Sequence, residues 1–104
     1  MIIYEVCLKV EKQVQDDFQN WMHSHIKEVL ECDGFISATW FEAQDLNSND
    51  SSWVIHYSMK GENSFENYLK EHAPRLREKT IARFGGRFTT TRRLLKPILV
   101  IDPQ

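Results

Sequence analysis

His25 and His56 are the side chains of this sequence best placed to transfer a proton near neutral pH. His25 falls within an apolar stripe at helical spacing, so its ring would face the protein interior and could serve as a base or a hydrogen-bond anchor. The alternative is a core histidine whose hydrogen bonds are satisfied. His23 is two residues away and would lie on another face of that helix, which argues against a metal-binding histidine pair.

A polar patch is expected where the first and third predicted strands lie side by side. Glu5, Cys7 and Lys9 share one face of the first strand, and His56 and Ser58 share one face of the third. Polar groups set in apolar surroundings commonly form small-ligand sites, and a buried Glu5 would hold its proton more tightly and could act as a base. The alternative is that Glu5 pairs with Lys9 or with an arginine. Cys7 is more readily explained as a small core residue than as a nucleophile.

Arginines are concentrated between residues 70 and 96, where nine basic residues face two acidic ones and give a local charge of +7. Guanidinium groups make bidentate contacts to carboxylates and phosphates, so a basic cluster at a predicted helix break could bind an anion. The candidates for this cluster are His72, Arg75, Arg83, Arg92 and Arg93. The alternative is that these arginines neutralise the acidic first half of the chain.

The composition argues against several classes of protein. The sequence has 104 residues, of which 41% are hydrophobic. This is enough for a single domain, residues 1–104, with one hydrophobic core. Its two cysteines form neither a disulfide framework nor a zinc motif, and no apolar stretch resembles a signal peptide or membrane span, which favours a cytoplasmic location. The net charge of −2, and the lack of an aromatic RNA-binding signature in residues 53–60, argue against nucleic acid. No metal or cofactor is expected.

Hydrophobic periodicity predicts the order of the elements. Residues 2–10 alternate as a strand, residues 12–31 form an amphipathic helix, and residues 35–44 and 53–60 form a hairpin across the polar loop 45–52. A second helix begins at Asn63 with a capping-box spacing to Glu66, breaks at Ala73–Pro74 and ends at Gly85. Residues 87–95 then return as a strand. This order predicts an α+β, ferredoxin-like βαββαβ fold with an antiparallel sheet and helices on one face.

The second face of such a sheet needs a partner. In residues 35–44, Phe35 and Phe41 are expected on one face and Ile36, Ala38 and Trp40 on the other, so both faces carry large apolar side chains. A symmetric homodimer with sheet packed on sheet satisfies this pattern. Residues 96–104 form a tail that could add a strand across that dimer; the alternative is that the tail covers a local sheet edge.

Three segments carry a resemblance to a known family: MIIYEV (1–6), WMHSHIKEVL (21–30) and YLKEHAPRLREKTIARFGGRF (68–88). Together they resemble small uncharacterised bacterial proteins of the dimeric α+β barrel superfamily, which also contains antibiotic-biosynthesis-type monooxygenases and stress-responsive barrel proteins. The resemblance implies a dimeric barrel, and it does not extend to the residue set of the haem-degrading branch. Because this superfamily hosts many activities, the fold alone does not give a function.

These observations lead to one hypothesis and two alternatives. We expect a homodimeric barrel that binds a small aromatic or anionic molecule between sheet and helices, with Glu5, His72, Arg75 and Arg92 as ligand contacts. The resemblance implies cofactor-independent oxidation or isomerisation, in which His25 or His56 would be the base and an arginine would stabilise an oxyanion. The first alternative is a structural or regulatory interaction module without a pocket, and the second is a basic surface for nucleic acid.

Overall fold

A computed structural model of the chain describes residues 1–48 and 51–103. Asn49 and Asp50 of the predicted loop, and Gln104 of the predicted tail, lie outside the described residues. The predicted order of elements is confirmed: β1 (Ile2–Val10), a short 3-10 turn η1 (Lys12–Val14), α1 (Gln15–Leu30), β2 (Phe35–Gln44), β3 (Ser51–Met59), α2 (Glu62–Glu71), α3 (Ala73–Phe84) and β4 (Phe88–Leu95).

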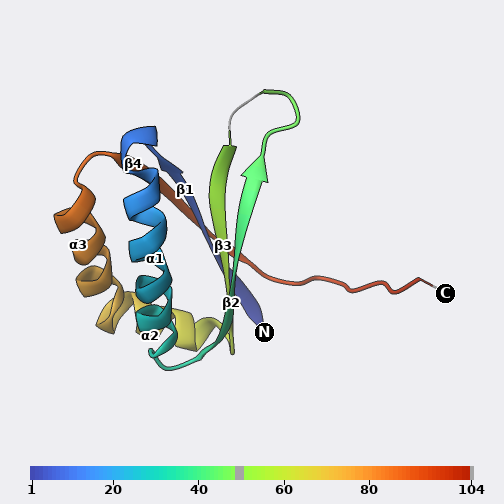
Figure 1. Cartoon of the computed structure of the whole chain (residues 1–104). Helices are drawn as coiled ribbons and strands as arrows, with labels where there is room; N and C mark the ends of the chain where they lie inside the picture. Colours follow the sequence, from blue (N-terminus) through green and yellow to red (C-terminus); the bar gives the residue numbers. More distant parts are fainter. Residues whose placement is uncertain (49–50, 104) are drawn as a thin grey trace.

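The four strands form one antiparallel sheet in the order β2-β3-β1-β4, with β2 and β4 at its edges. Figure 1 shows the three helices on one side of this sheet, while the other side carries no helix. The ferredoxin-like α+β fold predicted from the sequence is therefore confirmed. None of the helices among the described residues is long and apolar enough to cross a membrane.

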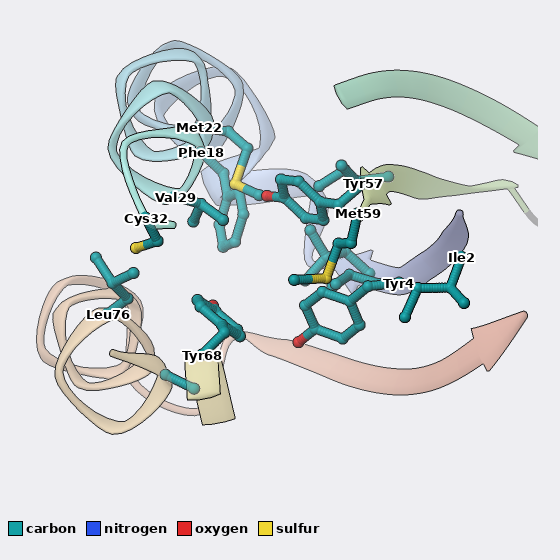
Figure 2. Close-up of a cluster of buried hydrophobic side chains, with 14 of the residues drawn as sticks. Ile2, Tyr4, Phe18, Met22, Val29, Cys32, Tyr57, Met59, Tyr68 and Leu76 are labelled. Carbon is teal, nitrogen blue, oxygen red and sulfur yellow. The ribbon is translucent and has the colours of Figure 1, made fainter. Parts of the chain in front are cut away.

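The core lies between the sheet and the helices. Alternation along β1 places Ile2, Tyr4, Val6 and Leu8 on the helix-covered face, and all four are buried. Phe18 is among the α1 residues that pack against them, and Figure 2 shows the core side chains gathered between the helices and the strands. The opposite side of the sheet, which we call the open face, carries the remaining residues of the same alternation.

A β-bulge in β2 corrects one prediction about the faces. The register shifts between Phe35 and Ser37, so Phe35 pairs with Met59 and lies on the core side with Trp40. Phe41 lies on the open face and is 44% exposed. The expectation that Phe35 and Phe41 share a face is wrong, because the extra residue at Ile36 reverses the alternation at that point.

The predicted capping box at Asn63 and Glu66 is also wrong. Helix α2 starts one residue earlier, after an extended Gly61, and no side-chain cap bond is made there within the described chain. The Lys60 N–H donates instead to the Gly34 carbonyl at 2.9 Å, which holds the end of β3 against the turn after α1. Gly34 has a φ of 90°, and a Cβ at this position would lie 2.3 Å from the Ser64 Cβ, so the close approach requires glycine.

The helix break at Ala73–Pro74 is confirmed. Helix α2 ends at Glu71, and α3 begins at Ala73 with Pro74 in its first turn, where the missing N–H has no helical partner to lose. The break turns the chain, so α2 and α3 pack as two separate helices over the sheet.

Candidate functional site

A cavity of about 330 Å³ lies between the sheet and the helices. Side chains from β1, β3 and β4 line it on one side, and side chains from α1, α2 and α3 line it on the other. Its volume is within the range of small-molecule sites. The lining includes three exposed residues, Ile81, Gly85 and Arg92. The cavity therefore opens to solvent where these residues lie.

Unsatisfied polar atoms are concentrated in this cavity. Within the described part of the chain, the buried side-chain atoms without a hydrogen-bond partner are His25 Nδ1, Arg77 Nε and Thr90 Oγ1. All three residues line the cavity. Because a buried polar group without a partner costs free energy, three such groups around one space make this cavity the candidate site of the chain.

His25 is held in this cavity by the aromatic side chain beside it. Its ring stacks on Trp21 with a centroid distance of 4.5 Å. Burial is the main cause that lowers the pKa of His25 below its ordinary value, while Glu28 opposes this effect. His25 is therefore neutral at pH 7, and in the tautomer that leaves Nδ1 unprotonated this atom can accept a proton or a hydrogen bond.

A cationic, tyrosine-lined region forms another part of the cavity. The Arg77 Nη2 donates to the Tyr4 hydroxyl at 3.2 Å, and the Tyr4 and Tyr68 rings lie 5.8 Å apart. Burial raises the pKa of Tyr68, and the charges of Arg77 and Arg92 partly offset this rise. Burial also raises the pKa of Tyr57. Tyr57 and Tyr68 are therefore neutral hydroxyl groups, and the positive charges of Arg77 and Arg92 act on Tyr68.

The remaining walls include an aromatic box. Phe18 lies 4.3 Å from Phe84 and 5.4 Å from Phe88, measured between ring centroids. All three rings belong to the core, and Phe18 and Phe88 line the cavity directly. An aromatic ring entering this part of the cavity would find edge and face contacts on several sides.

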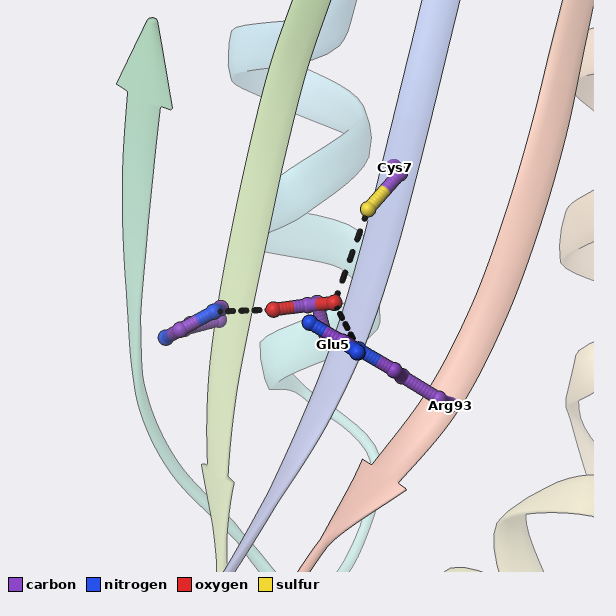
Figure 3. Close-up of polar contacts among 4 residues, drawn as sticks. Glu5, Cys7 and Arg93 are labelled. Atoms are coloured by element: carbon purple, nitrogen blue, oxygen red, sulfur yellow. Dashed lines mark hydrogen bonds and ion pairs between the residues drawn. The ribbon is translucent and has the colours of Figure 1, made fainter. Parts of the chain in front are cut away.

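The Glu5 patch lies on the open face, away from this cavity. Glu5 pairs across the sheet with His56 on β3 and Arg93 on β4. Its Oε2 accepts from His56 Nε2 at 2.7 Å, and its Oε1 accepts from Arg93 Nε at 2.5 Å (Figure 3). The predicted proximity of Glu5 and His56 is therefore seen, but the structure separates both from His25 and the cavity.

The alternative expected for Glu5, that it pairs with an arginine, is confirmed, because its partner is Arg93. Glu5 is only 5% exposed, yet the hydrogen bond from Arg93 lowers its pKa and outweighs the effect of burial, and the hydrogen bond from His56 adds to the lowering. The prediction that burial raises its proton affinity is wrong, because the carboxylate is paired. Burial, followed by the charge of Glu5, raises the pKa of Cys7, so this thiol is a poor nucleophile.

The basic cluster expected at the helix break does not assemble. Arg92 and Arg93 point to opposite faces of β4, because Arg92 pairs with Val6 on the core side and Arg93 pairs with Glu5. His72 and Arg75 contact each other at 3.2 Å at the surface between α2 and α3. Neither of them lines the cavity. Of the predicted site residues, the structure brings together only His25 and Arg92 in the cavity.

Two other basic residues of this segment, Arg83 and Lys79, contact neighbouring side chains of their own chain. The Arg83 guanidinium lies 5.4 Å from the centroid of the Phe84 ring. Lys79 pairs with Glu28 at 2.7 Å, which agrees with the alternative that basic residues of the second half neutralise the acidic first half.

The sequence reasoning missed Arg77 and Thr90. Arg77 shares the inner face of α3 with Leu76 and Thr80 at helical spacing, and Thr90 alternates with Phe88 and Arg92 along β4. A polar residue that interrupts an apolar periodic face is the signal that would have identified both. No group of three His, Cys, Asp or Glu suited to a metal ion is found in residues 1–48 and 51–103.

Several solved structures with the same fold are described as enzymes. One is a mutant of SnoaB from Streptomyces nogalater, which is described as a cofactor-independent oxygenase. It has 14% sequence identity and a TM-score of 0.67, and the match covers 98% of each chain. A protein of Deinococcus radiodurans, described as a candidate antibiotic biosynthesis monooxygenase, has 12% identity and a TM-score of 0.71, with 100% of this chain and 99% of that chain covered. A mutant of MhuD with two manganese protoporphyrin IX bound per active site has 10% identity and a TM-score of 0.63, with 99% and 100% covered.

At these identities the likeness shows the fold, which is that of antibiotic-biosynthesis-monooxygenase-type α+β barrel proteins. No curated protein matches the sequence. One family does match, over residues 1–98, and its description is "domain of unknown function (DUF4286)". Since this match spans nearly the whole sequence, the chain belongs to the DUF4286 family.

Proposed function

We propose that this protein binds a small aromatic molecule carrying an anionic group in the cavity between the sheet and the helices. The observation that supports the proposal most directly is the grouping of His25 Nδ1, Arg77 Nε and Thr90 Oγ1, all buried and unpaired, around that cavity. Two arginines favour a negative charge on the ligand, and the aromatic box favours a ring. This cavity favours the proposal over the alternative of an interaction module without a pocket.

The same groups suit a proton transfer from the bound molecule. His25 Nδ1 would accept a proton from a hydroxyl of the ligand, and the negative charge left on the ligand oxygen would be stabilised by Arg77 or Arg92. This step is common to the cofactor-independent oxidations and isomerisations that the fold supports. The proposal is supported by SnoaB, a protein of the same fold that is described as a cofactor-independent oxygenase.

We also propose that the protein works as a homodimer in which the open faces of two sheets meet. On this face, Phe41 is 44% exposed and Glu5 is already buried within one chain. A sheet packed on sheet would cover the apolar residues of the open face.

The ligand proposal is tested with two matched aromatic probes, 2-naphthoate and 2-naphthalenemethanol, which share a ring system and differ in charge. We expect the wild-type protein to bind 2-naphthoate at least about 10-fold more tightly, because a charged hydrogen bond to arginine contributes about 1.5–3 kcal/mol. Isothermal titration calorimetry should show this preference disappearing in the variants Arg77→Met and Arg92→Met.

Arg87→Met is the control, because Arg87 is exposed and does not line the cavity. This variant should keep the preference for the carboxylate. Equal affinity of the wild-type protein for both probes, or no binding of either, would contradict the proposal.

His25 is tested with 4-nitrophenol, whose absorbance near 400 nm reports ionisation of its hydroxyl. We expect the bound phenol to be more ionised at pH 6.5 than the free phenol, since a neutral His25 accepts the proton and the arginines stabilise the phenolate. His25→Gln should remove much of this difference. His23→Gln, two residues away on the exposed side of α1, should leave it unchanged. The same ionised fraction in both variants would remove His25 from the role of base.

A further inference from the structure

The cavity between the sheet and the helices changes character along its length. Two elements of its walls repeat one order of side chains, which is an aromatic ring, a threonine and an arginine. The order is Phe84, Thr80 and Arg77 toward the N-terminus of α3, and Phe88, Thr90 and Arg92 toward the C-terminus of β4. All of these residues except Phe84 line the cavity, and Phe84 packs against Phe18, which does line it.

Contacts across the cavity show that the two series run in the same direction. At one end, the aromatic rings of both series lie against Phe18, at centroid distances of 4.3 Å for Phe84 and 5.4 Å for Phe88. At the other end, the charges of both arginines act on the buried Tyr68. The cavity therefore has an aromatic end, at Phe18, and a cationic end, at Tyr68.

The spacing of the two series gives the distance between these ends. Phe84 and Arg77 are seven residues apart on a helix, which is about 10 Å at a rise of about 1.5 Å per residue. Phe88 and Arg92 are four residues apart on a strand, which is about 13 Å at about 3.3 Å per residue. A molecule that contacts both ends must hold its ring and its negative charge about 10–13 Å apart.

The cavity is also narrow for its length. Its volume of about 330 Å³ is at the low end for small-molecule sites, yet it extends from the aromatic end to the cationic end. A slender molecule, with one ring and a chain, fits such a space better than a broad system of several fused rings. The exposed lining residues Ile81, Gly85 and Arg92 belong to α3, its C-terminal end and β4, so the molecule would enter between these elements.

The middle of the cavity is polar. Thr90 lies two residues from either end of its series, and its Oγ1 is buried without a hydrogen-bond partner. His25, whose Nδ1 also lacks a partner, comes from α1 at a similar level, because it shares a surface groove with Lys79 and Ala82 of α3. These two α3 residues lie between the aromatic and cationic ends. An oxygen midway along a bound chain would accept a hydrogen bond from the Thr90 hydroxyl.

We propose that the ligand is an elongated aryl-alkyl carboxylate, with its ring at the aromatic end, its carboxylate at the cationic end and an oxygen midway along the chain beside Thr90. This inference rests on the proposed ligand site and names the chemical class that fills it. It requires one molecule to occupy both ends at once, whereas the proposed function requires only a ring and a negative charge.

The first test varies the length of the probe. Isothermal titration calorimetry compares 3-phenylpropanoate, 7-phenylheptanoate and 11-phenylundecanoate, of which the second spans the distance between the two ends when extended. We expect 7-phenylheptanoate to bind at least about 100-fold more tightly than 3-phenylpropanoate, and 11-phenylundecanoate to bind no more tightly than 7-phenylheptanoate. Hydrophobicity alone would raise the affinity about 4-fold with every added CH₂ group, so a steady rise through the longest probe would overturn the inference. Equal affinity for the two shorter probes would also overturn it.

The second test addresses the oxygen in the middle of the chain. The probe 4-oxo-7-phenylheptanoate carries a ketone midway between ring and carboxylate and otherwise matches 7-phenylheptanoate. The affinity ratio of the ketone to the parent acid should be about 5-fold higher for the wild-type protein than for Thr90→Val, which removes the hydroxyl and keeps the shape. Thr89→Val is the matched control, because Thr89 is exposed on the open face of β4, and it should keep the wild-type ratio. The same ratio in all three proteins would remove Thr90 from this role and overturn the assignment of a central oxygen.

The outcomes separate this inference from the proposed function. A protein that prefers 2-naphthoate to 2-naphthalenemethanol but shows no optimum in chain length would keep the charged aromatic site and lose the elongated ligand. Binding of neither 2-naphthoate nor 7-phenylheptanoate would overturn both. An optimum at 7-phenylheptanoate, together with the loss of the ketone preference in Thr90→Val, would support the ligand class and its orientation in the cavity.

Discussion

Phe18→Ala is expected to lower the free energy of unfolding by about 4 kcal/mol, the usual range for removing a fully buried phenylalanine being 3–5 kcal/mol. Phe18 has 0% exposure, and its ring contacts those of Phe84, Phe88 and Trp53. These partners come from α3, β4 and β3, so the truncation would remove packing from both layers at once. Urea unfolding followed by fluorescence measures the change.

Leu69→Ala provides the comparison, because Leu69 on α2 is 37% exposed and its removal leaves no enclosed void. We expect a loss of about 1 kcal/mol or less for this variant. Since Phe18 also lines the cavity between sheet and helices, Phe18→Ala should enlarge that cavity as well as weaken the fold. A loss for Phe18→Ala no greater than that for Leu69→Ala would mean that the site closes by repacking.

Elements whose signals are local were predicted well from the sequence. The alternation of apolar residues in 2–10 repeats often enough to identify a strand. The helical spacing of apolar residues in 12–31 likewise repeats often enough to identify a helix. The break at Pro74 follows from the covalent structure of proline, which acts wherever it occurs. These features do not depend on distant parts of the chain.

The faces of the edge strands were harder to predict. Nothing in residues 35–44 marks the extra residue at Ile36, because a bulge depends on how β2 meets β3. The faces on which the neighbouring residues Arg92 and Arg93 lie were also hard to predict. The sequence of β4 does indicate the face of Arg92, because Arg92 alternates with the apolar residues Phe88 and Leu94. This prediction is correct only if the alternation is continuous, since a shift of one residue would exchange the faces of Arg92 and Arg93.

The partners of Glu5 could not be predicted from neighbouring residues. Arg93 is 88 positions away and His56 is 51 positions away, and only the register of three strands brings them to one carboxylate. Burial alone predicts a raised pKa for a carboxyl group, whereas a specific cation reverses the sign. The cavity residues Arg77 and Thr90 were not predicted, because the number of arginines in a segment does not show which of its polar residues face the interior.

Glu5→Gln is expected to lower the free energy of unfolding by about 2 kcal/mol at pH 7, the range for a hydrogen bond to a charged group. The substituted amide would keep an acceptor but would turn an N–H₂ group toward one of two donors, His56 Nε2 or Arg93 Nε. Glu28→Gln is the matched control, because the Glu28–Lys79 pair is partly exposed on both sides and should contribute about 0.5 kcal/mol. All variants are compared by urea unfolding at one protein concentration, since a dimer makes stability depend on concentration.

The difference between wild-type and Glu5→Gln protein should depend on pH in a way that identifies its cause. The pKa of Glu5 is lowered in the folded protein, so folding favours the ionised form, and this stabilisation is fully present above the unfolded pKa of about 4.3. It is lost as the pH falls through the lower, folded pKa, because a protonated Glu5 resembles glutamine. The difference should therefore shrink toward zero as the pH falls from about 5 to about 2. A difference that stays unchanged at low pH would show that packing around Glu5, and not its charge, stabilises the open face.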